Sequence, residues 1–322
     1  MPTDVRRSVV WYGVPEGEPR SLHIESASVN APSPDEYQIS YANGSLTLVY
    51  QRVAGGPVSS QYTLAIRGLL EWNDTSGDGI LEDGSVVAYT PLGPSAFGHY
   101  PISHTETSTP AGVNVNSFEI PSNNGEITLS LTIADGFVAL PSGQTLTPME
   151  AKLTFVINHE MTSPATRLSL QVGLSTSQRV ALNNRSWDDL NDFSSEDRAV
   201  NVTSPTGSPP SSAFFAWSNF ATVNGVNGTV TPMGPTFNET TGDYNLYLSY
   251  PKALSSSLRV QIVHDPTMGI VSAAYDSIIH PAQGSPLQFG GDSVVYSASL
   301  AGIAAVVAGT ALLVNRRRRK AP

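Results

Sequence analysis

The chain has 322 residues, of which 27 are acidic and 17 are basic, so its formal net charge is −10. Five of the basic residues lie between 316 and 320, and residues 1–293 therefore carry 12 basic against 27 acidic side chains, a net charge of −15. Such an acidic domain excludes nucleic acid as a partner, because tracking phosphates requires clustered Lys and Arg. The chain has no cysteine, which excludes a thiol nucleophile and favours a prokaryotic or archaeal cell surface.

Residues 1–20 are predicted to form an N-terminal extension. Arg6 and Arg7 precede the apolar run SVVWYGVP. A secretory signal peptide has this order of charged and apolar residues, but the run is too short for its core and no clear cleavage site follows. The residues therefore predict no export signal at this end.

Short apolar runs recur from residue 38 to residue 265, separated by clusters of Gly, Pro, Asn, Ser and Asp. Many of the runs alternate apolar with polar residues, which suits strands that have one face on a core. The pattern predicts a mainly β protein whose N-terminal domain is a β-sandwich. The predicted strands are 38–42, 45–53, 62–72, 85–90, 126–134, 151–159, 167–175, 227–232, 243–251 and 257–265.

The Ser/Pro-rich stretch 201–213 is predicted to be a linker. The strands before it would form one sandwich unit over 21–200. The strands after it would form a second, smaller β unit over 214–280, or alternatively complete the first pair of sheets. Residues 281–293, PAQGSPLQFGGDS, are predicted to form a flexible stalk.

The C-terminal residues predict a transmembrane helix over 294–314. This segment has no charged residue, and 21 residues at about 1.5 Å each span about 30 Å, the thickness of a bilayer's hydrocarbon core. The tail 315–322 contains the five cations, and a cationic cluster after a span marks the cytoplasmic side. We therefore expect a single-pass protein of the cell membrane, with its N-terminal domain outside and its tail in the cytoplasm.

Partners follow from the same segment. The membrane helix would contact lipid, and the outer domain would contact a protein or glycan at the cell surface. Two pairs of small residues in the helix, Ala298/Gly302 and Ala305/Gly309, have the spacing that allows membrane helices to approach closely. A homo-oligomer formed through this helix is therefore a secondary expectation.

A candidate metal site lies between two predicted strands, at residues 73–85. Oxygen-bearing side chains alternate along it, and Gly79 stands where a sharp turn is needed. The pattern resembles the calcium loops of EF-hand proteins, which implies a structural calcium ion. The twelfth place is Ser85, where those loops carry a bidentate Glu, and a polar hairpin turn without an ion is the alternative. The implied ligands are Asp74, Ser76, Asp78, the carbonyl of Ile80, Glu82 and Asp83.

Six Asn-X-Ser/Thr triplets predict N-glycosylation of an exported surface, with ordinary polar turns as the alternative. The candidate residues are Asn43, Asn73, Asn184, Asn201, Asn227 and Asn238.

No catalytic residue is predicted. The pair His264–Asp265 precedes a proline and is better explained as the end of a strand than as a proton-transfer pair. His159–Glu160 lacks the second His of the zinc-protease motif. The aromatic residues of 214–220 and of 244–250 are expected in a core, and a sugar-binding surface is the alternative.

These observations predict a membrane-anchored surface protein with a non-enzymatic structural, adhesion or binding role, stabilised by calcium. One alternative is a surface-anchored hydrolase that acts on glycans, which carboxylates at catalytic spacing in a cleft would favour. The other is the outer domain of a subunit of a larger membrane complex, which an exposed apolar patch would favour.

Overall fold

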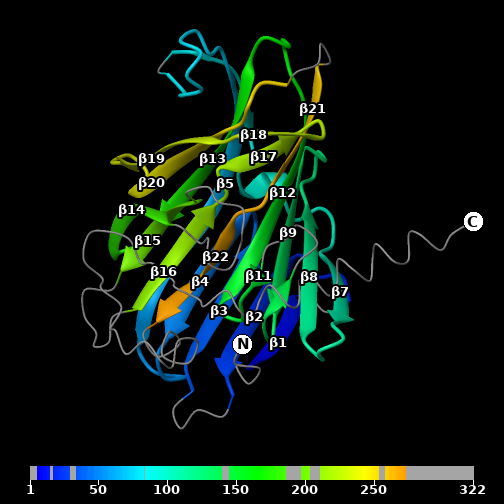
Figure 1. Ribbon diagram of the computed structural model, residues 1–322, viewed down its shortest axis with the longest axis vertical. Helices are drawn as coiled ribbons and strands as arrows, with labels where there is room; N and C mark the ends of the chain where they lie inside the picture. Colours follow the sequence, from blue (N-terminus) through cyan, green and yellow to red (C-terminus); the bar gives the residue numbers. More distant parts are fainter. Residues whose placement is uncertain are drawn as a thin grey trace, which may run out of the picture.

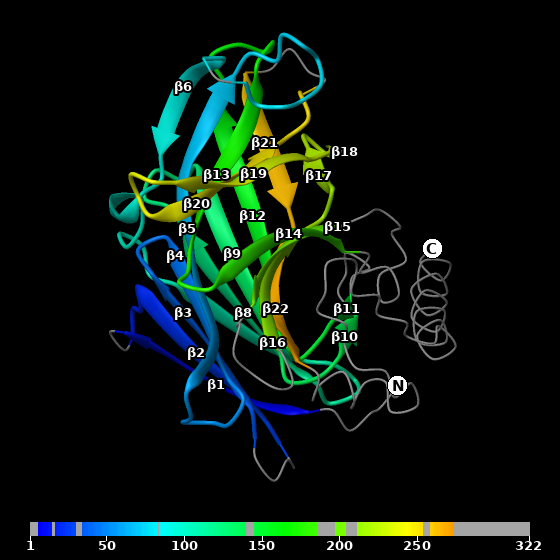
Figure 2. The ribbon, with the colours of Figure 1, turned by 90° about the vertical axis from the view of Figure 1, so that its left-hand side faces the viewer.

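The computed structural model describes residues 6–14, 17–29, 34–82, 84–139, 145–185, 197–203, 211–253 and 258–272. These residues form two antiparallel sheets that face each other across a shared core (Figures 1 and 2). Within them there is no α-helix, and one 3₁₀ turn spans Pro94–Ala96. The predicted mainly β class is therefore confirmed, and the two facing sheets are consistent with a sandwich.

The first sheet has the strand order β1-β2-β3-β4-β5-β13-β20-β19, and β6 lies beside the far end of β5. Hairpins connect its first five strands, which explains why neighbours in sequence are neighbours in the sheet. Its members are β1 (Arg7–Val14), β2 (Ser21–Ser28), β3 (Glu36–Ala42), β4 (Ser45–Gln51), β5 (Val58–Trp72), β6 (Val86–Pro91), β13 (Arg167–Ser175), β19 (Thr231–Asn238) and β20 (Asp243–Ser249).

The second sheet is built around β12, which pairs with β9 on one side and with β21 and then β22 on the other. β7 and β8 extend it past β9, β16, β15 and β14 extend it past β22, and β17 and β18 extend it past β21. A small ribbon joins β10 (Val138–Ala139) and β11 (Thr145–Leu146). The sheet's members are β7 (Ser103–Ser108), β8 (Asn114–Pro121), β9 (Ile127–Ala134), β12 (Glu150–Glu160), β14 (Arg179–Arg185), β15 (Asp197–Thr203), β16 (Ser211–Trp217), β17 (Phe220–Val223), β18 (Val226–Thr229), β21 (Arg259–His264) and β22 (Thr267–Ser272).

The core lies between the sheets and follows from the alternation of the strands. Along β3 every second side chain, from Tyr37 through Ile39 to Tyr41, is buried, and β9 buries Ile127, Leu129, Leu131 and Ile133 in the same way. These side chains belong to one continuous cluster that draws on both sheets. Each such side chain contributes about 1.5–3 kcal/mol when it leaves water, so this cluster is the main source of stability.

The division into two β units is not the arrangement found. Strands on both sides of residues 201–213 share both sheets: β20 pairs with β13, β21 pairs with β12, and β22 pairs with both β12 and β16. Phe215 and Tyr250 lie in the same core cluster as Tyr37. The Ser/Pro composition of the stretch indicated a boundary, but long-range pairing unites the strands, and the alternative of one completed pair of sheets describes them.

The assignment of residues 1–20 to an extension is also corrected, because residues 7–14 form β1 and pair along their whole length with β2. Among the described residues, no helix could serve as a membrane span. The predicted stalk 281–293, membrane helix 294–314 and tail 315–322 lie outside the described residues.

Candidate functional site

The predicted metal loop joins β5 to β6 at the upper end of the molecule in Figure 1. The backbone N–H of Asn73 donates to the carbonyl of Ser85 (3.0 Å), which closes its base. The carboxylate of Asp74 accepts hydrogen bonds from the N–H groups of Gly77 (2.8 Å) and Gly79 (3.2 Å). Gly77 has φ +78° and Gly79 has φ +76°, and residues with a side chain disfavour such positive φ angles. The turn therefore forms around the carboxylate of Asp74.

Arg167, the first residue of β13, approaches this loop from the sheet. Its Nε lies 2.5 Å from Oδ2 of Asp74, and both side chains are largely buried. Burial would raise the pKa of Asp74, but the N–H of Gly77, the Arg167 guanidinium and the N–H of Gly79 outweigh burial and lower it. Leu81 packs with Leu70 and Trp72 beneath the loop. An ion pair and an apolar contact thus fasten the loop to the sheet.

Three of the remaining predicted ligands, Ser76, Asp78 and Glu82, make contacts within the loop. Ser76 Oγ lies 3.4 Å from Asp74 Oδ1, and Asp78 Oδ1 accepts the N–H of Ile80 (2.8 Å). Glu82 Oε2 accepts a hydrogen bond from Thr75 (3.3 Å), and Asp83 lies outside the described residues.

In the described part of the loop, the carboxylate of Asp74 is held by partners within the chain. Calcium takes six to eight oxygen ligands, about 2.3–2.6 Å away, whereas the oxygens of Asp74 are engaged with N–H groups and Arg167. Within the described ranges no group of three or more His, Asp or Glu side chains is placed to hold a metal ion. Calcium binding at this loop stays a prediction.

Glu71, next to the loop on β5, was not identified from the sequence. Its side chain is buried and accepts hydrogen bonds from the turn between β12 and β13. The donors are the N–H of Thr162 (2.9 and 2.8 Å), the N–H of Ser163 (3.2 Å) and the hydroxyls of Thr162 and Thr166. Burial alone would raise the pKa of Glu71, but these hydrogen bonds lower it. The only sequence signal was an acid inside an apolar run, LLEW.

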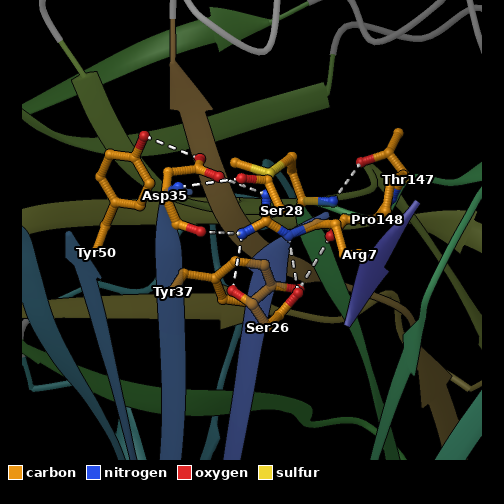
Figure 3. Close-up of polar contacts among 9 residues, drawn as sticks. Arg7, Ser26, Ser28, Asp35, Tyr37, Tyr50, Thr147 and Pro148 are labelled. Carbon is orange, nitrogen blue, oxygen red and sulfur yellow. Dashed lines mark hydrogen bonds and ion pairs between the residues drawn. The ribbon is translucent and has the colours of Figure 1, made fainter. Parts of the chain in front are cut away.

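A second polar cluster lies among β1, β2, β3 and β4 (Figure 3). The buried guanidinium of Arg7 donates to Ser26 Oγ (2.9 Å), to the Ser26 carbonyl (2.7 Å) and to Asp35 Oδ1 (2.9 Å). It lies 5.3 Å from the centre of the Tyr37 ring. The hydroxyl of Tyr50 donates to Asp35 Oδ2 (3.1 Å). Both oxygens of Asp35 and the charge of Arg7 are therefore used inside the fold.

The pair His264–Asp265 separates in space. His264 is buried, its Nε2 lies 3.0 Å from the carbonyl of Ser218, and its Nδ1 lies 3.4 Å from the hydroxyl of Tyr250. Because a carbonyl can only accept, Nε2 carries the proton. Burial lowers the pKa of His264 to about 4, so the ring is neutral at pH 7. Asp265 instead pairs with Lys152 (3.0 Å) and accepts a hydrogen bond from Thr154 (2.7 Å).

The glycosylation candidates occupy different environments. Asn43, Asn73 and Asn227 are exposed, and Asn43 has φ +49° in the hairpin between β3 and β4. Asn238 is half-buried, and its side-chain carbonyl accepts the N–H of Thr240 (2.9 Å). Asn184 and Asn201 lie on β14 and β15, and their side chains lie outside the described part.

The aromatic residues mostly belong to the core, as expected. Phe214, Phe215, Trp217 and Tyr250 are buried. Phe220 is the exposed member of its group, at 46%. Tyr244 and Tyr247 are half-buried, and the four buried members of the seven aromatic residues in the two ranges offer no face to a sugar.

Among the described residues, five ion pairs between an Arg or Lys and an Asp link distant parts of the chain. Three of them, Arg7–Asp35, Lys152–Asp265 and Arg167–Asp74, belong to the sites above. The other two are Arg6–Asp135 and Arg67–Asp243. The described polar centres are thus occupied by internal contacts. No protein-family model matches the chain, and no curated protein is significantly similar to it.

Proposed function

We propose that the protein is a single-pass, membrane-anchored protein of the cell surface with a non-enzymatic structural, adhesion or binding role. The anchor rests on the uncharged segment 294–314 and the cations of 316–320. The acidic domain lies outside the cell and the basic tail lies in the cytoplasm.

One observation supports a non-enzymatic role: the buried and half-buried charges named above are paired within the fold. A general acid or base must exchange a proton with a substrate, and its pKa should lie near the working pH. Glu71 and Asp74 have lowered pKa values, and their oxygens hold donors of this chain. Asp35 is similarly occupied by Arg7 and Tyr50. Groups in these settings stabilise a scaffold.

Calcium and glycans are secondary parts of the proposal. A calcium ion would have to draw Asp74 away from Arg167 and recruit Glu82 and Asp83, and it would act as a structural ion. Glycans would be attached first at Asn43, Asn73 and Asn227, because these side chains are exposed.

Alkaline extraction of membranes tests the anchor. The parent chain is expected to stay in the membrane pellet. The variant Ile303→Asp/Val307→Asp is expected in the soluble fraction, because each central Asp costs about 2.5–3.5 kcal/mol of insertion. The variant Gln288→Asp/Ser293→Asp adds the same charge outside the span and should remain in the pellet. Release of the parent chain by alkali would contradict the anchor.

A further inference from the structure

β1 is an edge strand with an open side. It pairs with β2 from Arg7↔Ser28 to Val14↔Ser21, and among the described residues it pairs with no other strand (Figure 2). The N–H of Val29 donates to the carbonyl of Arg6 (3.4 Å), so even-numbered residues of β1 direct their backbone groups towards β2. The backbone groups of Val9, Trp11 and Gly13 therefore point to the open side.

At Arg7, the first residue of β1, the outward-facing backbone N–H has a partner within the chain. The N–H of Arg7, an odd-numbered residue, points away from β2 and donates to the carbonyl of Asp135 (2.8 Å). Beyond Arg7, the strand is held by β2 and by its inner side chains. The Trp11 ring lies 4.1 Å from the ring of His104 and 5.2 Å from that of Phe118, measured between centres. The strand is thus fixed in place, while beyond Arg7 its outer edge pairs with no other strand of the described residues.

The side chains that flank this edge on the outer face are apolar. Val10 is 55% exposed, Tyr12 is 49% exposed and Val14 is 57% exposed. From Ser8 to Val14 the strand has no charged residue and no proline. An apolar edge strand of this kind is a ready template for another strand.

Three other edge strands of the two sheets, β19, β7 and β18, carry protective features. β19 contains Pro232 and Pro235, which have no N–H to donate, and its register shifts between Met233 and Thr236. β7 exposes Glu106, and β18 has only four residues. Charge, proline and shortness are the usual means of preventing edge pairing. From Ser8 to Val14, β1 has none of them.

We propose that β1 pairs with β1 of a second copy of this chain, so that two first sheets become one continuous sheet across a twofold axis. In the register centred on Trp11, Val9 faces Gly13 of the other copy and Val10 faces Tyr12. The odd-numbered residues form the hydrogen-bonded pairs, and each of these pairs exchanges two hydrogen bonds. The exposed row joins an aromatic side chain to a β-branched one, a favourable cross-strand combination.

Charge permits a second copy at this edge, and the symmetry of the register favours it. Residues 1–293 carry a net charge of −15, so two copies repel each other over most of their surface. They can approach closely only where no acid faces an acid, and the segment from Ser8 to Val14 meets that condition. The register is also self-complementary, as a twofold contact requires. This inference deepens the proposed surface role and depends on it only for where the dimer would form. The contact itself lies in the described domain and not in the membrane anchor.

Because the chain has no cysteine, disulfide trapping can test the register directly. Full-length Val10→Cys and Tyr12→Cys proteins are mixed in a mild detergent and oxidised. In the proposed register these residues form a directly opposite, non-hydrogen-bonded pair. The Cα atoms of such a pair lie about 4.5 Å apart, within disulfide range. The mixture should form linked dimers several-fold faster than either variant alone. A mixture of Tyr12→Cys with Val14→Cys is the matched control, because these equally exposed positions are not opposite each other.

Charged substitutions at the same positions give an independent test, in which light scattering measures the mass of the protein and so shows whether it is a dimer. Val10→Glu/Tyr12→Glu places acids opposite each other and should abolish the dimer, whereas Val10→Lys/Tyr12→Glu places opposite charges together and should restore it. Equal trapping in all mixtures, a monomeric parent at every concentration, or a dimer unaffected by both double variants would overturn the proposal. The last outcome would place the contact elsewhere, such as the membrane helix, and leave the surface anchor intact.

Discussion

Glu71 offers the sharpest test of how the upper end of the fold is held together. Its carboxylate is buried, and it holds the turn between β12 and β13 through the N–H groups of Thr162 and Ser163 and two hydroxyls. The substitution Glu71→Gln keeps the shape of the side chain. It removes the charge and turns an NH₂ group towards donors that need an acceptor.

The cost can be estimated from these contacts. A hydrogen bond to a charged group contributes about 1.5–3 kcal/mol, a neutral one about 0.5–1.5 kcal/mol, and a buried donor without an acceptor costs about 1–3 kcal/mol. The hydroxyls can rotate, and Thr166 already lies 2.6 Å from the carbonyl of Ser163. The two backbone N–H groups cannot rotate. Weakening one of their bonds and losing the other amounts to about 3 kcal/mol.

Urea unfolding of the full-length chain in a mild detergent measures this difference. The control is Glu119→Gln on β8, whose side chain is exposed and which should change stability by no more than about 0.5 kcal/mol. Because the pKa of Glu71 is lowered in the fold, its contribution is present above the ordinary value of 4.5 and is lost as the pH falls through the folded value. The variant should therefore show a flatter loss of stability in acid. A variant as stable as the control at pH 7 would refute this account of the turn.

Three further predictions follow from the other polar groups. The pKa of His264 is lowered to about 4 in the fold, so as the pH falls the unfolded state binds the proton first. The free energy of unfolding of the parent should therefore fall by on the order of 3 kcal/mol between pH 6.5 and pH 4. Loss of this pH dependence in a His264→Gln variant would support the assignment, and a variant with the same pH profile as the parent would oppose it. Arg167→Met should lower stability by about 2 kcal/mol and speed proteolysis of the loop 73–85, and a parent-like digestion pattern would argue against the role given to the Asp74 ion pair. If calcium binds, it should raise the melting temperature of the parent and not that of Asp78→Ala; melting unaffected by a chelator would leave the loop closed by Arg167 alone.

Local patterns were sufficient for the class of the fold. The runs 38–42 and 167–175 lie within β3 and β13, because alternation of apolar and polar residues directly reports a half-buried strand. β1 was missed for a physical reason. Arg7 looked like part of a charged N-terminus, and only its burial against Ser26 and Asp35, a residue 28 positions away, shows that it belongs to a sheet.

The sequence was sufficient to predict a loop at the candidate site, but not the contacts that the loop makes with the rest of the fold. The spacing of Asp74, Ser76 and Asp78 marked a turn rich in oxygen ligands, and the structure places a turn there. The partner of Asp74 is Arg167, on a different strand, and no local pattern announces it. The separation into two units failed similarly, because Ser and Pro mark a break in local structure, whereas the pairing of β20 with β13 is long-range.

In the proposed topology, residues 294–314 anchor the described domain so that it faces outwards from the membrane. Protease treatment of intact cells, with one epitope tag at each end of the chain, measures this directly. We expect protease to remove the N-terminal tag, while the C-terminal tag survives until the membrane is permeabilised. Protection of both tags in intact cells, with loss of both after permeabilisation, would contradict it.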